Sequence, residues 1–177
     1  QGRALYRLKR SQEALAAYAT SIKLKPEFPD AWDGLTTTLY GLKRYQELLE
    51  FSDKIIQLQP DFYPAWFGRG RALYGFKRYS EALAAAEKVI QLKPDLADAW
   101  SGRGNVLYRL RRPQEALASF DKAIQLDADN FDSWYYRGYI LDDLKRYEEA
   151  LQAYDKALSI STANIASMPW HNKGITL

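Results

Sequence analysis

The sequence lacks cysteine, and its 177 residues include a single histidine, His171. Without cysteine the chain can form no disulfide bond, no thiolate nucleophile and no cysteine-bound zinc site. One histidine has no second imidazole with which to share a metal ion. We therefore expect no metal, no cofactor and no catalytic residue, and we predict that the chain is not an enzyme.

Long apolar segments and a strong net charge are also missing. No apolar run reaches about 18 residues, the length of a membrane-spanning helix, and the first residues, QGRALYRLKR, do not resemble a signal peptide. The net charge of +3 is too small to indicate a nucleic-acid partner by itself. We expect a cytoplasmic protein that contacts no membrane.

What the sequence does contain is a pattern that repeats every 34 residues. Tryptophan stands at positions 32, 66, 100 and 134, and the residues behind each tryptophan keep the same step. The shared positions hold Tyr40, Tyr74 and Tyr108; Glu47, Glu81, Glu115 and Glu149; Leu58, Leu92 and Leu126; and Pro26, Pro60 and Pro94. A period of this length indicates a stacked array of similar units rather than one globular core.

Each unit is predicted to contain two helices. In residues 97–130, apolar residues from Trp100 to Leu110 mark one helix, and those from Ala116 to Leu126 follow the spacing of a second helix face. Pro113 suits the first position of the second helix, where a missing N–H group is tolerated. The prolines that close the first three units are typical of residues just past a helix end.

A basic pair separates the two helices of every unit, and a glutamate follows three residues later. The pairs are Lys9-Arg10, Lys43-Arg44, Lys77-Arg78, Arg111-Arg112 and Lys145-Arg146. We predict that these cations end the first helix and the glutamates begin the second, each stabilising a helix dipole by up to about 1 kcal/mol. Asp30, Asp98 and Asp132, two residues before a tryptophan, are predicted to cap the first helices.

Motifs that imitate catalytic or phosphate-binding sites have structural explanations. The segments Gly68-Arg69-Gly70 and Gly102-Arg103-Gly104 lack the third glycine of a phosphate-binding loop and fall inside predicted helices. The carboxylate pairs Asp142-Asp143 and Glu148-Glu149 lie at predicted helix ends, on either side of Lys145-Arg146. Charges at helix ends offset the helix dipole, so we interpret both pairs as solvated structural charges.

The repeated residues resemble the tetratricopeptide repeat. A tryptophan opens the unit, a glycine follows four positions later, an alanine and then an aromatic residue lie in the second helix, and a proline closes the unit. The matching residues are Gly70, Gly104, Gly138 and Gly174; Ala14, Ala82, Ala116 and Ala150; and Tyr18, Phe120 and Tyr154. The resemblance implies an all-α fold, a right-handed α-solenoid (superhelix) of stacked antiparallel helix hairpins.

The 34-residue step predicts the unit boundaries of one continuous array over residues 1–177. The units are 1–28, a partial first repeat; 29–62; 63–96; 97–130; 131–164; and 165–177, the start of a sixth repeat. The last unit is displaced, because its tryptophan is Trp170 rather than residue 168. Both ends fall within a first helix without a polar capping helix, so we expect a window from a longer array or end repeats that self-associate.

Close helix approach explains the small residues of the pattern. The glycine of the first helix is predicted to face the alanine of the second, while the aromatic residues fill gaps toward the next unit. The second unit has Thr36, Leu48 and Ser52 in place of glycine, alanine and an aromatic residue. We therefore predict a slightly wider or tilted helix pair in residues 29–62.

The resemblance also implies a binding groove. In proteins similar to this chain, the first helix of each unit lines the concave face, and a peptide or partner segment lies along it. The family's groove positions correspond here to Arg3, Tyr6, Arg7, Asp33, Thr37, Tyr40, Phe67, Arg71, Tyr74, Ser101, Asn105, Tyr108, Arg109, Tyr135, Tyr139 and Asp142. Tyr40, Tyr74 and Tyr108, which recur every 34 residues, suit packing within the hairpin as well as contact with a partner. The groove residues that vary between units are the preferred binding candidates.

The favoured function is a non-enzymatic scaffold for protein–protein interaction. The lysine and asparagine clamp with which some family members hold the acidic tail of a chaperone is absent, because Asp33, Phe67, Ser101 and Tyr135 take the place of the lysine. The net charge alternates between units, from +4 in residues 1–28 to −3 in the second unit and +3 in the third. An extended partner segment with apolar anchors and mixed charge would be complementary.

Two alternatives remain open at the level of sequence. The array can be a regulatory or substrate-docking arm of a larger protein, including an enzyme. It can also be an RNA-binding helical repeat, although the basic pairs lie at the predicted hairpin corners rather than in the groove, and we do not expect nucleic acid as the partner.

Overall fold

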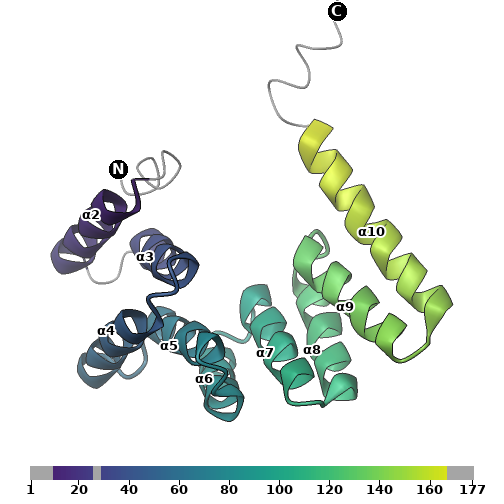
Figure 1. Ribbon diagram of the computed structural model, residues 1–177, viewed down its shortest axis with the longest axis horizontal. Coiled ribbons are helices and arrows are strands. Elements are labelled where there is room, and N and C mark those ends of the chain that lie inside the picture. The colour runs from purple at the N-terminus through teal and green to yellow at the C-terminus, as the bar shows by residue number, and fades with distance from the viewer. Residues whose placement is uncertain (1–9, 26–28, 167–177) are drawn as a thin grey trace, which may run out of the picture. The chain divides into compact units, whose positions relative to one another are not determined.

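The computed structural model describes residues 10–25 and 29–166, and every regular element in them is an α-helix (Figure 1). The helices are α2 (Ser11–Leu24), α3 (Pro29–Gly41), α4 (Tyr45–Leu58), α5 (Tyr63–Gly75), α6 (Tyr79–Leu92), α7 (Ala97–Arg109), α8 (Pro113–Leu126), α9 (Phe131–Asp143) and α10 (Tyr147–Ala166). The predicted all-α solenoid of helix hairpins is confirmed. Pro113 begins α8 as expected, whereas Pro26 and Trp170 lie outside the described residues.

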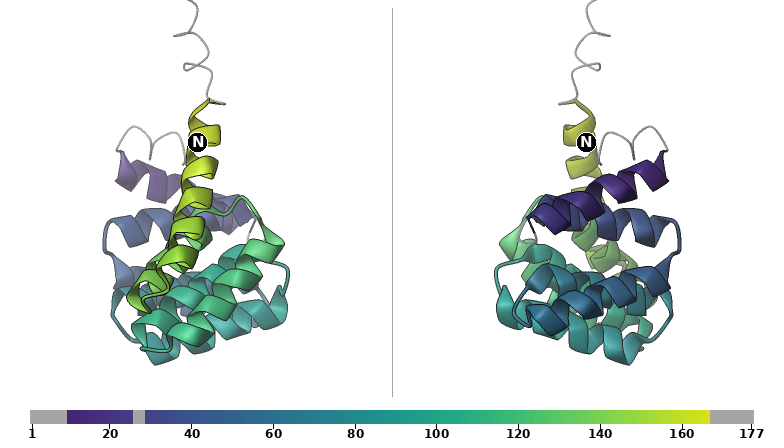
Figure 2. Two further views of the ribbon diagram at one scale, coloured as in Figure 1. Left: turned by 90° about the vertical axis from the view of Figure 1, so that its right-hand side faces the viewer. Right: turned by 90° about the vertical axis from the view of Figure 1, so that its left-hand side faces the viewer.

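The chain divides into two compact units, Gln1–Pro94 with α2 to α6 and Asp95–Leu177 with α7 to α10. Within the first unit, α3 packs on α4 and α5 on α6; within the second, α7 packs on α8 and α9 on α10 (Figures 1 and 2). Each pair is one 34-residue hairpin. That the repeats form one continuous array across both units stays a prediction.

A left-handed residue closes the first helix of four hairpins. Lys43, Lys77, Arg111 and Lys145 have φ angles of 57°, 62°, 61° and 61°. At one of these turns, the N–H of Lys77 donates to the carbonyl of Tyr74 and the N–H of Arg78 to that of Leu73, both at 2.9 Å. These two bonds satisfy the last helical carbonyls in a Schellman motif. The first residue of each basic pair thus occupies the position that glycine favours.

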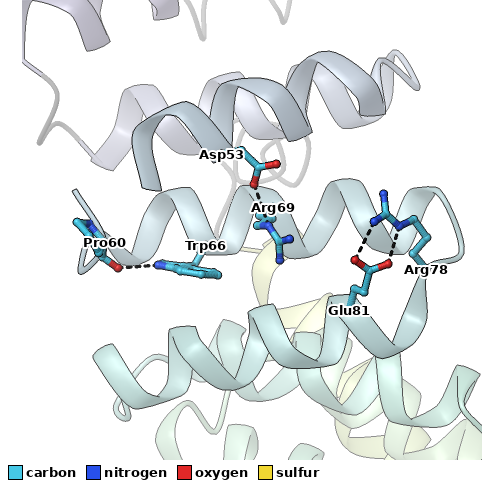
Figure 3. Close-up of polar contacts among 6 residues, drawn as sticks. All are labelled: Asp53, Pro60, Trp66, Arg69, Arg78 and Glu81. Atoms are coloured by element: carbon cyan, nitrogen blue, oxygen red, sulfur yellow. Dashed lines mark hydrogen bonds and ion pairs between the residues drawn. The ribbon is translucent and has the colours of Figure 1, made fainter. Parts of the chain in front are cut away.

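The second residue of each basic pair precedes the next helix and pairs with its first turn. Nε and Nη2 of Arg78 donate to the two carboxylate oxygens of Glu81 at 2.7 Å each (Figure 3). This hydrogen bonding lowers the pKa of Glu81. The same two-bonded contact, with the same lowering of the glutamate pKa, joins Arg44 to Glu47, Arg112 to Glu115 and Arg146 to Glu149.

The aspartates ahead of the tryptophans are not helix caps, so this prediction is wrong. The first helices begin one residue before them, which places Asp30, Asp98 and Asp132 in the first turn. The cap of α9 is Asn130, whose Oδ1 accepts a hydrogen bond from the N–H of Ser133 at 2.9 Å. The aspartate carboxylates still favour the positive end of the helix dipole.

The tryptophans anchor the turn that precedes their helix. Nε1 of Trp66 donates to the carbonyl of Pro60 at 2.7 Å (Figure 3). The guanidinium carbon of Arg69 lies 5.7 Å from the centre of the Trp66 ring, and its Nε contacts Asp53 of α4 at 2.8 Å. The equivalent contacts in the second unit join Trp134 to Ala128, and Arg137 to Trp134 and Asp121.

The glycine of the first helix approaches an aromatic ring where the second helix supplies one. A Cβ atom added to Gly104 would lie 2.8 Å from Cε2 of Phe120. Ala86 takes the place of that ring opposite Gly70, where an added Cβ would lie 3.5 Å from Cβ of Ala85 and 3.8 Å from the carbonyl oxygen of Ala82, the alanine of the pattern. The predicted glycine–alanine contact therefore holds for Gly70 and is wrong for Gly104. It is also wrong for Gly138, whose added Cβ would lie 2.8 Å from the ring of Tyr154.

The three exceptional residues of the second repeat meet in the core. Thr36, Leu48 and Ser52 are at most 2% exposed. They surround Gly68 of the next hairpin, where an added Cβ would lie 2.8 Å from Ser52 Oγ and 3.4 Å from the other two side chains. Ser52 Oγ is buried, with no hydrogen-bond partner in the described part of the chain. The backbones of α3 and α4 approach each other much less closely than those of the other three hairpins, which supports the predicted wider or tilted helix pair.

Helix α10 has 20 residues, whereas α4, α6 and α8 have 14 each. Its last turns extend beyond α9 and pass the predicted unit boundary at residue 164 (Figure 2). Thr162 stands where earlier units have Pro60, Pro94 and Ala128, so no proline blocks continuation of the helix there. Leu151 of α10 is 63% exposed, although its equivalent Leu117 is 8% exposed. No described helix is long and apolar enough to span a membrane.

Candidate functional site

The predicted groove residues lie on the first helices, and each unit has its own face. The first unit contributes Asp33, Thr37 and Tyr40 from α3 and Phe67, Arg71 and Tyr74 from α5. The second contributes Ser101, Asn105, Tyr108 and Arg109 from α7 and Tyr135, Tyr139 and Asp142 from α9. Arg3, Tyr6 and Arg7 lie outside the described residues.

Arg71 connects the two first helices of the first unit. Its Nη1 donates to Oγ1 of Thr37 at 3.3 Å, and its guanidinium carbon lies 4.9 Å from the centre of the Tyr40 ring. All three side chains are half-buried. A guanidinium that lies on an aromatic face loses little further freedom when it binds a carboxylate, so the arrangement suits recognition of an anion.

Two of the tyrosines that recur every 34 residues pack against another ring. The Tyr40 ring lies 5.3 Å from that of Tyr45, and the Tyr74 ring lies 5.5 Å from that of Tyr79. Both partners are the first residues of the second helix of the same hairpin. These tyrosines therefore stabilise the hairpin, and contact with a partner stays a prediction for them.

The second unit brings tyrosines and carboxylates together. Tyr108 Oη donates to Oδ2 of Asp143 at 3.3 Å, and its ring lies edge-on to that of Tyr139 at 5.7 Å. Burial, followed by the charge of Asp143, raises the pKa of Tyr108. Tyr135 and Tyr139 are 43% and 46% exposed. The sequence predicts Asp143 to be a structural charge at a helix end, although its spacing of 35 from Tyr108 places it one residue past the repeat step.

Ser101 does not belong to the exposed face. It is 8% exposed, and its Oγ lies 2.5 Å from Oγ of Ser133, which is fully buried. The hydroxyl thus joins α7 to α9 and is occupied within the fold. The remaining positions of the set are accessible: Asp33, Arg109 and Asp142 are exposed, and Phe67 and Asn105 are half-buried.

Features of a catalytic centre are limited in the described residues. Residues 10–25 and 29–166 contain no group of three or more histidine, aspartate or glutamate side chains that could hold a metal ion. Gly68-Arg69-Gly70 and Gly102-Arg103-Gly104 lie inside α5 and α7, as predicted, and form no phosphate-binding loop. His171 lies outside the described residues.

Comparison with protein families gives a match over most of the chain. One model of the tetratricopeptide repeat matches residues 1–61 and 101–165, and a second matches residues 63–96. The comparison with curated proteins returns no match.

Solved structures with the same fold are numerous. TTC0263, a thermophilic TPR protein of Thermus thermophilus, is 22% identical, with a TM-score of 0.79 over 99% of this chain and 96% of that one. MamA of Desulfovibrio magneticus RS-1 is 20% identical, with a TM-score of 0.70 over 92% of both chains. YrrB, a TPR protein described as having an unusual peptide-binding site, is 21% identical, with a TM-score of 0.64 over 98% and 89%. At these identities the likeness concerns the fold alone.

Proposed function

Because the chain belongs to the tetratricopeptide repeat family, we propose that it is a non-enzymatic scaffold that binds an extended segment of a partner protein on its first-helix faces. Helical repeat arrays offer extended surfaces for such partners. YrrB, which shares the fold, is described as having a peptide-binding site. The support from this chain itself comes from the side chains on its first helices.

The observation that carries the proposal is the placement of Arg71. Its contacts with Thr37 and Tyr40 hold a guanidinium on the face formed by α3 and α5. The tryptophan-to-proline pattern of the repeat does not require an arginine there, since Thr37, Asn105 and Tyr139 occupy the equivalent positions of other units. A charged side chain that is held in place and that the repeat pattern does not require is typical of a binding surface.

The two faces favour different chemistry in the partner. In the first unit, Arg71 and the neighbouring Phe67 suit an acidic residue next to an apolar anchor. In the second unit, Tyr135, Tyr139 and Asp142 suit an apolar or cationic residue. The partner segment would therefore carry apolar anchors together with charges of both signs.

RNA binding is less well supported. RNA would need cations that can contact phosphates, but Arg44, Arg78, Arg112 and Arg146 each make two hydrogen bonds to a glutamate at a hairpin turn. These ion pairs neutralise one of the two basic residues at each of the four turns. Filter binding to RNA that weakens steeply with added salt would contradict this interpretation.

The test is a pull-down with the full chain and a triple alanine variant of Phe67, Arg71 and Tyr135. The matched control replaces the exposed Lys54, Gln57 and Lys156 on second helices. We expect partners to be lost from the groove variant alone, while its melting temperature changes little because these side chains are half-buried or exposed. Equal recovery of partners by both variants would overturn the proposal. A docking arm of a larger protein would use the same faces. The length of the native reading frame distinguishes that alternative from a separate scaffold.

A further inference from the structure

Helix α9 carries an exposed aromatic stripe that the other described first helices, α3, α5 and α7, lack. Phe131, Tyr135 and Tyr139 follow one another at four-residue intervals and are 39%, 43% and 46% exposed. We call these three residues, together with Asp142 and Asp143 at the end of the helix, the α9 stripe. The equivalents of Tyr135 and Tyr139 are polar in α3 (Asp33, Thr37) and in α7 (Ser101, Asn105), so the repeat pattern does not require aromatic residues here.

The rings of the α9 stripe are held in place by their neighbours. Tyr135 stacks on Phe131 at 6.1 Å and contacts the Tyr154 ring of α10 at 5.9 Å. Tyr139 meets the edge of Tyr108 from α7 at 5.7 Å. Rings that are fixed before binding lose little side-chain entropy when a ligand arrives.

The end of the stripe is negatively charged. Asp142 and Asp143 are exposed and lie at the C-terminus of α9, where the helix carbonyls add negative potential. Tyr108 donates a hydrogen bond to Asp143 and so fixes one carboxylate beside the rings. Cations on the adjoining segments are Arg146, which is paired with Glu149, and the exposed Arg109 and Lys145.

The first unit contains a guanidinium on the equivalent positions of another first helix. There the guanidinium of Arg71 lies 4.9 Å from the Tyr40 ring and donates to Thr37. On α9 the equivalents of Thr37 and Tyr40 are Tyr139 and Asp142. Tyr139 offers an aromatic face and Asp142 a carboxylate, and a carboxylate is a stronger acceptor for a guanidinium than a hydroxyl group.

From this arrangement we infer that the α9 stripe binds an arginine side chain of the partner segment. The guanidinium lies against the rings of Tyr135 and Tyr139 while its N–H groups donate to Asp142 or Asp143. This assignment rests on the proposed function, because it names one residue of the segment that the first-helix faces bind. It also explains why the stripe combines aromatic rings with carboxylates.

The test uses the full 177-residue chain with isotope-labelled tyrosines and a short extended peptide, acetyl-Gly-Pro-Arg-Pro-Gly-amide. The matched peptide replaces arginine by citrulline, which keeps the shape of the side chain but carries no charge. We expect the arginine peptide to shift the ring signals of Tyr135 and Tyr139 and to bind about tenfold more tightly than the citrulline peptide. Added salt should weaken binding of the arginine peptide but not of the citrulline peptide.

Two variants distinguish specific recognition from non-specific binding. Tyr139→Leu removes one ring, and Asp142→Asn with Asp143→Asn removes both charges. Each should weaken binding of the arginine peptide severalfold while the far-UV circular dichroism spectrum stays unchanged. Tyr147→Leu is the control, because Tyr147 is 53% exposed on α10 and lies outside the stripe. It should leave binding unchanged.

Equal binding of both peptides, or arginine binding that survives the two stripe variants, would overturn the inference. Neither result would affect the proposed function if the triple alanine variant still loses its partners in the pull-down. Conversely, arginine-selective shifts at Tyr135 and Tyr139 support the inference even when the pull-down recovers no partner.

Discussion

Gly104 lies directly beneath the ring of Phe120, so close that a Cβ atom at this position would stand 2.8 Å from Cε2 and 2.9 Å from Cζ of the ring. The contact joins the first and second helices of one hairpin. Gly102, only two residues away on the same helix, has no side chain or other hairpin atom within 4 Å of an added Cβ. The two glycines therefore give a matched pair for measuring what close packing contributes.

Gly104→Ala should destabilise the chain by about 1–3 kcal/mol, because the ring of Phe120 must move and overpacking outweighs the better helix propensity of alanine. Gly102→Ala should stabilise it by about 0.5–1 kcal/mol through that propensity alone. Urea unfolding followed by circular dichroism measures both. If the two substitutions shifted the midpoint in the same direction, the packing argument would be wrong.

The orphan hydroxyl of Ser52 should be dispensable. Ser52→Ala removes a buried group that lacks a partner among the described residues and should be neutral or stabilising by up to about 1 kcal/mol. Gly68→Ala should destabilise, since its Cβ would meet Ser52 Oγ at 2.8 Å. In a double-mutant cycle the second substitution should cost at least about 0.5 kcal/mol less when Ser52 is already alanine. Additive effects would show that the two sites do not touch.

Replacing Lys77 by glycine should make the fold more stable. Its φ of 62° is unfavourable for a residue with a Cβ atom. We expect Lys77→Gly to stabilise by about 0.5–1 kcal/mol, after allowing for the larger entropy of glycine in the unfolded chain. Lys77→Ala keeps the Cβ and removes the charge, so thermal melting of this control should stay near that of the parent. A gain in the alanine variant as large as in the glycine variant would point to charge instead.

Acid should weaken the hairpin turns together. Hydrogen bonds from the arginines hold the pKa of Glu47, Glu81, Glu115 and Glu149 below the ordinary value of 4.5. A carboxylate with a lowered folded-state pKa stabilises the fold above its unfolded pKa, and this contribution is lost as the pH falls through the folded value. Melting temperature should therefore decline as the pH falls below that ordinary value.

Glu81→Gln provides the control for this pH dependence. The variant should be slightly less stable at neutral pH, and its melting temperature should fall less on acidification than that of the parent, because one titrating pair is gone. Each pair is exposed, so the single effect is small and the comparison is best made with all four glutamates replaced. An identical slope in parent and fourfold variant would contradict the assignment.

The sequence predicts the helices well because their signals repeat. Glu81 and Pro113 each occupy a position with a local physical meaning, and α6 and α8 begin where these two residues indicate. The positive φ of Lys77 could not be predicted with the same certainty, since lysine gives no preference for that conformation. The basic pair predicted an interaction with the helix dipole but gave no sign of the left-handed backbone conformation at the turn.

Contacts between helices were harder to predict than the helices themselves. Ser101 occupies a groove position of the repeat, yet its burial depends on Ser133 of the next hairpin, 32 residues away. Whether Gly104 meets an alanine or a ring depends on which side chain of α8 points toward it; the sequence favours Ala116, but the structure places Phe120 there. Sequence spacing fixes the face of a helix but not the residue across it.

The division of the chain between Pro94 and Asp95 falls within two residues of a repeat border. Each half keeps its own set of buried side chains, including Leu73 and Val89 in the first and Leu107 and Ile140 in the second. A cut at this place interrupts no helix. Gene duplication or protein engineering could therefore insert, delete or exchange whole modules there, and the specificities of the two halves could diverge separately.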